Sequence, residues 1–193
     1  MRTAEVSRKT NETDIKIKLN LDGSGMSDIN SGSGFFDHML TLFAAHGGFD
    51  LTVVCDGDTE VDYHHSVEDI GIALGTAFSE ALGDKRGITR YGSFILPMDE
   101  ALILCAVDLS GRCHLNYDIK VPAESLGDFD TEVAREFMYG FARTAACALH
   151  FKQFDGIDSH HILEGAYKAM GRALKMAVSY SGTNEIPSTK GVL

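Results

Sequence analysis

Hydrophobic and polar positions alternate strictly over residues 13–21, which is typical of a half-buried antiparallel strand. Over residues 34–45 the apolar side chains recur at helical spacing instead, and this pattern predicts an amphipathic helix. A short apolar run at 49–55 indicates another strand, and a second helical pattern covers 66–82. The first half of the chain therefore predicts a mixture of strands and helices.

The second half repeats this order, so that the chain reads as strand, strand, helix, strand, helix, twice. Small mixed sheets with two helices packed on one face of each would bury these apolar faces in an α+β fold. We expect an internally duplicated molecule with half-repeats at 1–88 and 89–193, and a surface tail at 182–193. The elements expected in the second half are strands at 101–108 and 114–119, a long helix at 129–149, a short apolar run at 151–154 and a helix at 159–178.

A five-residue motif makes the duplication explicit. His64-His65-Ser66-Val67-Glu68 recurs 96 residues later as His160-His161-Ile162-Leu163-Glu164, with the glutamate at the same offset. Histidine nitrogen and carboxylate oxygen together form the ligand set of divalent metals such as Mn, Fe, Co and Zn. Because the motif occurs twice, the sequence predicts a two-metal site.

Helix geometry adds a pairing to this prediction. If each motif begins a helix, its first histidine and its glutamate, at i and i+4, share a face. Adjacent histidines point about 100° apart on a helix, so each pair should serve two ions. One ion would take His64 and Glu68 with His161, and the other would take His160 and Glu164 with His65. In the alternative, Ser66 and Asp69 form a capping box, and the helix starts after the histidines.

Composition narrows the class of protein. The formal net charge of -11, from 28 acidic and 17 basic residues, argues against a nucleic-acid or acidic-membrane binder. A few placed Arg and Lys residues can still hold a phosphate. The sequence has no secretory signal pattern and no run of about 18 apolar residues, and its four cysteines form no CxxC pair. We therefore expect a cytoplasmic protein with reduced cysteines.

Four further motifs stand beside the two HHxxE blocks: Phe36-Asp37-His38-Met39-Leu40, Ala45-His46-Gly47, Asp108-Leu109-Ser110-Gly111-Arg112 and Ile186-Pro187-Ser188-Thr189-Lys190-Gly191-Val192-Leu193. Together these motifs resemble the imidazoleglycerol-phosphate dehydratase family from end to end. The resemblance implies a manganese enzyme of histidine biosynthesis, a hydro-lyase that converts imidazole glycerol phosphate to imidazole acetol phosphate and water. It also implies a homo-oligomer of 24 subunits with active sites at subunit contacts, and no stretch remains for the phosphatase domain of some relatives.

The resemblance implies two Mn²⁺ ions per active site and adds one ligand to each. His38 would join His65, His160 and Glu164 at one ion. At the other ion, Glu136 would join His64, Glu68 and His161. Many relatives have histidine at the position of Glu136, and a carboxylate can replace imidazole on Mn²⁺. The alternative is a solvated glutamate on a helix.

The resemblance also implies the groups that handle the substrate. Glu12 would be the acid/base group, although by itself it reads as a surface residue before a strand. Arginine can bind phosphate through two hydrogen bonds, while lysine supplies a point charge. The substrate-binding positions implied are His46, Arg90, Arg112, Lys168, Ser188, Thr189 and Lys190.

Two other functions remain open from the residues alone. A metal-storage or structural metal protein would use the paired motifs for assembly, but it gives no reason for Glu12 or the terminal Pro-Ser-Thr-Lys. A dinuclear hydrolase would attack a phosphate or amide with a bridging hydroxide, but it predicts carboxylate-rich ligands. The ligand set here is mostly histidine.

Overall fold

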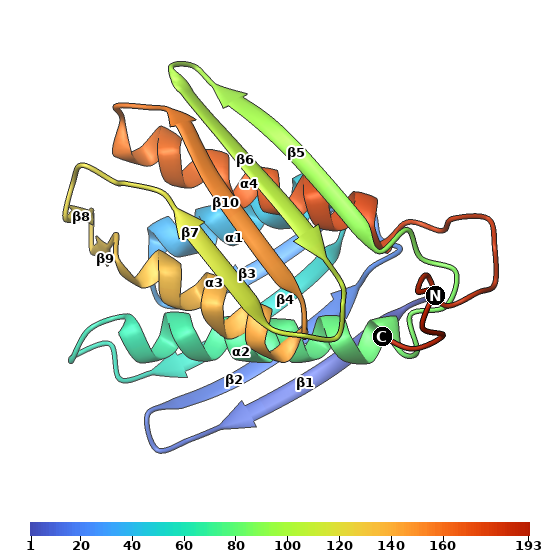
Figure 1. Cartoon of the computed structure of the whole chain (residues 1–193). Helices are drawn as coiled ribbons and strands as arrows, with labels where there is room; N and C mark the ends of the chain where they lie inside the picture. The colour runs from blue at the N-terminus through green and yellow to red at the C-terminus, as the bar shows by residue number, and fades with distance from the viewer.

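Two four-stranded sheets enclose four helices in the computed structural model, which describes residues 1–193 (Figure 1). The first sheet has the strand order β1-β2-β4-β3, in which β3 runs parallel to β4 and the other neighbours are antiparallel. The elements of this half are β1 (Thr3–Lys9), β2 (Thr13–Asn20), β3 (Ser27–Asn30), α1 (Gly34–Gly47), β4 (Asp50–Gly57) and α2 (His64–Leu82).

The second sheet repeats the arrangement with the order β5-β6-β10-β7, and β7 is the strand parallel to its neighbour β10. A small hairpin, β8 with β9, is an addition without a counterpart in the first half. The elements are β5 (Tyr91–Met98), β6 (Ala101–Asp108), β7 (His114–Asp118), β8 (Ser125–Leu126), β9 (Phe129–Asp130), α3 (Val133–Thr144), β10 (Ala148–Asp155) and α4 (Ser159–Val178).

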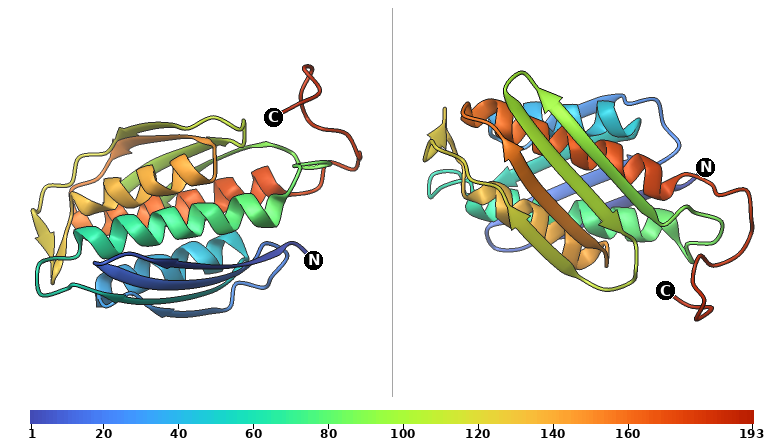
Figure 2. Two further views of the ribbon diagram at one scale, coloured as in Figure 1. Left: turned by 90° about the horizontal axis from the view of Figure 1, so that it is seen from below. Right: turned by 45° about the horizontal axis from the view of Figure 1, so that its top comes forward.

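The helices form two inner layers between the sheets (Figure 2). Helices α1 and α2 cover the first sheet and α3 and α4 cover the second, while α1 packs on α4 and α2 on α3. Each half thus has two helices on one face of a mixed sheet, which confirms the predicted α+β fold. None of the helices is long and apolar enough to cross a membrane.

The apolar faces of all these elements meet in one continuous core. In β2, Ile15, Ile17 and Leu19 are buried between exposed lysines, as the alternation predicts. Aromatic rings fill the space between the helix layers, where Phe137 packs edge-on against Phe36 at 5.3 Å between ring centroids. Such pairs add about 0.5–1.5 kcal/mol beyond the area they bury.

Small residues set the spacing between paired helices. A Cβ on Gly75 of α2 would lie 2.5 Å from the carbonyl oxygen of Phe141 in α3. A Cβ on Gly171 of α4 would lie 2.6 Å from the carbonyl oxygen of Phe43 in α1. Because only glycine permits these approaches, the helices of the two halves come into backbone contact.

Several predicted elements are confirmed, and one is wrong. The strand at 101–108 and the helix at 159–178 have the predicted bounds. The predicted helix at 129–149 is wrong, because β9 occupies its start and α3 ends at Thr144. There Ala146 takes a left-handed conformation with φ of 49°, which turns the chain into β10. Three strands precede the first helix of the first half, rather than two, and the short polar strand β3 was not predicted. In the second half, three strands of the main sheet and the β8–β9 hairpin precede α3.

Candidate functional site

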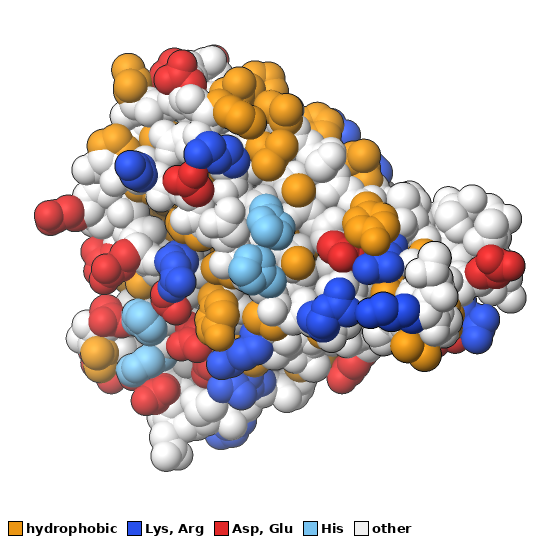
Figure 3. Space-filling view, viewed as in Figure 1, with side chains coloured by type: hydrophobic (Ala, Val, Ile, Leu, Met, Phe, Trp, Pro, Cys, Tyr) orange, Lys and Arg blue, Asp and Glu red, His pale blue; other side chains and the backbone are white.

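The four helices begin at the same end of the molecule, where the histidine motifs lie (Figure 1). Helix α2 starts at His64 and α4 at Ser159, so both motifs are helical and the alternative capping box is wrong. Ser66 is instead buried, and its hydroxyl has no hydrogen-bond partner. A pair of histidines is visible among acidic side chains at this end (Figure 3).

An aspartate two residues before each motif holds the start of its helix. Asp62 accepts a hydrogen bond from the backbone N–H of His64 at 2.7 Å. Asp158 accepts from the N–H groups of His160 at 2.8 Å and His161 at 3.1 Å. A carboxylate at this position satisfies free helix N–H groups and interacts favourably with the helix dipole.

The two rings of each histidine pair diverge as helix geometry predicts. The His64 and His65 rings are 6.2 Å apart with planes at 76°, and the His160 and His161 rings are 6.4 Å apart at 82°. Two adjacent rings at this spacing present their nitrogens to different regions. The pairs are therefore built alike in the two halves.

Three predicted ligands from two helices form one group. The ligand atoms of His38 on α1 and of His160 and Glu164 on α4 all lie within 4.8 Å of one another. One Glu164 carboxylate oxygen lies 3.0 Å from His160 Nε2 and 3.4 Å from His38 Nε2. Two imidazole nitrogens and a carboxylate oxygen around one point fit a divalent metal ion of the Mn-to-Zn series.

Glu164 is the buried member of this group, with 8% of its side chain exposed. Burial acts to raise the pKa of its carboxyl, but the hydrogen bond and charge of Lys168, with the hydrogen bonds of His160 and His38, together lower the net pKa. Lys168 contacts the second oxygen of this carboxylate. The carboxylate is therefore ionised at neutral pH, as a metal ligand must be.

His46 lies on α1 near the cations of α4. Burial, followed by the charges of Lys168 and Arg172, lowers the pKa of the imidazole. A neutral His46 adds no repulsion beside these two cations. The Glu164 carboxylate, which is paired with Lys168, offsets part of their charge.

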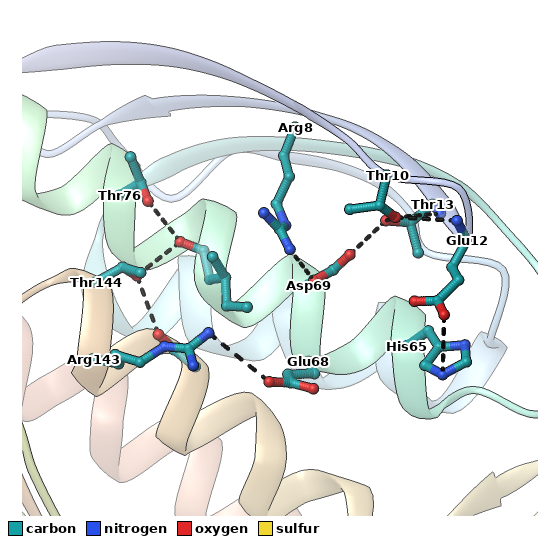
Figure 4. A network of polar contacts seen from close by, with 12 residues as sticks. Arg8, Thr10, Glu12, Thr13, His65, Glu68, Asp69, Thr76, Arg143 and Thr144 are labelled. Carbon is teal, nitrogen blue, oxygen red and sulfur yellow. Dashed lines mark hydrogen bonds and ion pairs between the residues drawn. The ribbon is translucent and has the colours of Figure 1, made fainter.

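His65, the second histidine of the first motif, faces the turn between β1 and β2. Glu12, at the tip of this turn, places a carboxylate oxygen 3.8 Å from His65 Nε2 (Figure 4). In the second half, Asp99 stands at the tip of the turn between β5 and β6, 3.8 Å from His161 Nε2. Each half thus directs a hairpin carboxylate at the second histidine of its motif.

Buried polar contacts fix the turn that carries Glu12 (Figure 4). The carboxylate of Asp69, on α2, accepts a hydrogen bond from the Thr13 hydroxyl at 2.6 Å. It also accepts one from the guanidinium of Arg8 at 2.7 Å. Helix α2 therefore holds both strands that flank the turn.

The second predicted ligand set is not assembled within one chain. His64 Nε2 and a Glu68 carboxylate oxygen lie 4.0 Å apart, and Arg143 is 3.9 Å from the other oxygen of Glu68. Glu136 on α3 is paired with its neighbour Arg135 at 2.9 Å. His65 and His161 also lie outside the group around Glu164. The exchange of histidines between the two ions stays a prediction.

The predicted phosphate-binding residues of the tail lie far from the histidines. Arg90 donates its backbone N–H to the carbonyl of Ala177, sixteen residues beyond His161 on α4 and about 24 Å away at 1.5 Å per residue. Its guanidinium binds both carboxylate oxygens of Asp108, at 2.7 and 3.2 Å, and the Pro187 carbonyl at 2.9 Å. These bonds hold the tail, and Lys and Arg side chains gather at this end (Figure 3).

The remaining tail residues are exposed near Arg90. Lys190 donates its backbone N–H to the Ser188 hydroxyl at 3.2 Å, and its side chain is exposed like that of Thr189. The loop before Arg112 approaches the last residue, since a Cβ on Gly111 would lie 2.7 Å from the carbonyl carbon of Leu193. The predicted site residues therefore divide into a helix-start group and a tail group.

Sequence and structure comparisons with known proteins identify the family of this chain. Residues 31–174 match the family model of imidazoleglycerol-phosphate dehydratase. The chain belongs to the imidazoleglycerol-phosphate dehydratase family. The dehydratase of Desulforamulus reducens is 54% identical over 193 residues, covering 100% of this chain and 98% of that one. The dehydratase of Thermoanaerobacter pseudethanolicus is 55% identical over 194 residues, with both chains covered completely.

Solved structures of the family have the same fold. The imidazoleglycerol-phosphate dehydratase of Pyrococcus furiosus aligns with a TM-score of 0.85 at 38% identity, covering 97% of this chain and 100% of that one. The dehydratase of Staphylococcus aureus aligns with a TM-score of 0.84 at 36% identity, covering 93% and 99%. These values confirm the resemblance that the motifs indicate.

Sequence reasoning missed the carboxylates that contact the motifs. Asp62 and Asp158 share one offset from the paired histidines, so the repeat extends to D-x-H-H and could have indicated them. Asp58 and Glu100 contact His65 and His161 from loops that are not equivalent in the two halves. No sequence pattern marks that pair.

Proposed function

We propose that this dehydratase uses two Mn²⁺ ions, held by its paired histidines and glutamates, to convert imidazoleglycerol phosphate to imidazole acetol phosphate and water. The reaction and its place in histidine biosynthesis follow from membership of the family. The observation that supports the metal is the group formed by His38, His160 and Glu164. A second ion would take His64, Glu68 and His161 with Glu136.

The chemistry sets a role for each group. Two divalent ions, when bound, supply Lewis acidity and hold the substrate as a template while hydroxide leaves. The carbon next to the departing oxygen must lose a proton for the enol and then the ketone to form. Glu12, 3.8 Å from His65 Nε2, is the proposed base for this proton. Its position on a short turn held by Asp69 keeps the carboxylate over the site.

The phosphate would be bound by the tail group and by Lys168. Arg112 and Lys190 present exposed cations, and Ser188 and Thr189 add hydroxyl donors. Arg90 is already bonded to Asp108 and Pro187, so its first role is to hold the tail in position.

The distance between the two groups argues for sites shared between copies. About 24 Å of helix separates His161 from the point where Arg90 meets α4, which is too far for one small phosphate ester to span. The tail of one copy would therefore complete the helix-start group of another. We propose a closed homo-oligomer of 24 subunits, in which every active site lies at a subunit contact.

Metal dependence of turnover tests the proposal. Protein stripped with a chelator should form no imidazole acetol phosphate, and turnover should return as Mn²⁺ is added, with two ions bound per site. Glu12→Gln should bind Mn²⁺ normally but lose about 10²–10⁴-fold in kcat. Glu5→Gln, an exposed glutamate on β1, is the matched control and should retain full activity. Metal binding without turnover would favour a storage protein, and full activity in Glu12→Gln would remove the proposed base.

A further inference from the structure

Two carboxylates outside the predicted ligand set contact the second histidine of each motif. A carboxylate oxygen of Asp58 lies 2.9 Å from Nδ1 of His65. A carboxylate oxygen of Glu100 lies 2.8 Å from Nδ1 of His161. Both contacts have the length of a strong hydrogen bond to a charged acceptor, and both leave Nε2 as the free nitrogen.

The contact decides which nitrogen can bind a metal. A neutral imidazole carries one N–H, and a carboxylate can only accept, so the proton is held on Nδ1. Nε2 then presents its lone pair, in a ring whose orientation is fixed. His38 and His160 differ, because they direct Nε2 at Glu164 itself.

Both carboxylates are themselves held in position. Glu100 accepts backbone N–H bonds from Ile157 at 3.1 Å and Asp158 at 2.7 Å. The backbone N–H of Asp58 donates to the carbonyl of Glu12 at 3.0 Å, which joins Asp58 to the turn that carries the proposed base.

The two carboxylates do not descend from one repeated position. Asp58 follows β4, whereas Glu100 lies in the turn between β5 and β6. The same Nδ1 contact is therefore made in both halves from different loops. Because two different loops supply the same contact, both histidines are expected to need a carboxylate at Nδ1.

We infer that Asp58 and Glu100 are positioning residues that fix Nε2 of His65 and His161 for metal binding. This inference rests on the proposed two-metal function. The family pattern assigns His65 and His161 to different ions, so each carboxylate should govern the affinity of one ion. Loss of such a partner typically weakens metal binding about 10–100-fold.

Titration with Mn²⁺, followed by electron paramagnetic resonance of the free ion, tests the inference on the full-length assembled protein. Wild type should bind two ions per chain. Asp58→Ala and Glu100→Ala should each weaken one of these two binding steps about 10–100-fold and leave the other within a few-fold. Asp58→Asn and Glu100→Gln keep an acceptor for Nδ1–H and should lose less. Asp84→Ala, which removes an exposed pair with Arg86, is the control and should bind like wild type.

The outcomes separate the inference from the proposed function. Wild-type binding with unchanged constants in both alanine variants would overturn the inference alone. No binding of Mn²⁺ by the wild type would overturn the proposed metal function and the inference with it. Circular dichroism and thermal unfolding of the metal-free variants provide a folding check. Equal weakening of both ions together with a lower Tm would assign the carboxylates a general structural role instead.

Discussion

Asp69 is a buried carboxylate on α2 that holds both strands flanking the turn of Glu12. Asp69→Ala would remove two hydrogen bonds and leave the Arg8 guanidinium without its partner. We expect a loss of about 2 kcal/mol in the free energy of unfolding, since bonds to charged groups contribute more than neutral ones. Urea denaturation measures this loss. Asp14→Ala, which breaks an exposed pair with Lys9 on the same hairpin, should change stability far less. Equal losses in the two variants would contradict the importance of Asp69.

Asp22 gives the fold a dependence on acid pH. Hydrogen bonds from the Arg2 guanidinium, opposed by burial, lower the pKa of the Asp22 carboxyl below its ordinary value of 3.8. Because the folded pKa lies below the unfolded pKa, the stabilisation is complete above about pH 4 and disappears as pH falls through the folded value. Asp22→Asn should cost about 0.5–1 kcal/mol at pH 6. Denaturation curves at pH 6 and pH 2.5 should show this gap closing in acid, and a constant gap would contradict the linkage.

At the scale of elements, the close contact between α2 and α3 depends on glycine. Gly75→Ala would place a Cβ 2.5 Å from the Phe141 carbonyl oxygen and 2.3 Å from the Thr144 hydroxyl, so the helices must separate. We expect a loss of about 1–3 kcal/mol, the usual cost of overpacking a core, measured as a lower midpoint in urea denaturation. Gly34→Ala on α1 is the matched control, because its Cβ would meet nothing within 4 Å. A Gly75→Ala protein as stable as the control would show that the helix layers can adjust.

The predictability of each element follows from what its residues bury. Strand β6 was predicted because every second side chain is buried, and α4 because its apolar face is continuous. Strand β1 was not predicted, since it lies at the edge of its sheet and exposes mostly polar side chains. The predicted end of the helix that contains α3 was wrong, because Ala146, a good helix former, takes the left-handed conformation that is usual for glycine.

The candidate site, like the fold, contains some residues that the sequence could predict and others that it could not. The paired histidines could be predicted because repeated spacing on a helix constrains geometry within one element. Their partners Asp58 and Glu100 could not, because each contact joins a loop to a helix in a way that only tertiary structure determines. Glu12 and the tail residues entered through family resemblance alone. The group formed by His38 with Glu164 also depends on the packing of α1 against α4.

At the scale of the whole molecule, the helix-start group and the tail group lie at opposite ends of the four helices. A site completed by a second copy predicts complementation between two inactive variants. Glu164→Gln damages the helix-start group, and Lys190→Ala damages the tail group, so each protein alone should have low activity. Unfolded together and refolded as mixed oligomers, the two should recover about a quarter of wild-type activity, because random assortment pairs an intact half from each copy.

Matched mixtures distinguish complementation from a general effect of mixing. Glu164→Gln mixed with His160→Ala places both defects in the helix-start group, so no site regains an intact helix-start group and activity should stay low. Recovery in this control mixture would indicate a general effect of mixing. No recovery in the Glu164→Gln and Lys190→Ala mixture would mean that each chain builds its site alone. The tail would then have to reach about 24 Å along its own α4, which the bonds of Arg90 to Asp108 and Pro187 oppose. The proposed shared site would keep these bonds and still bring phosphate-binding cations to the histidines.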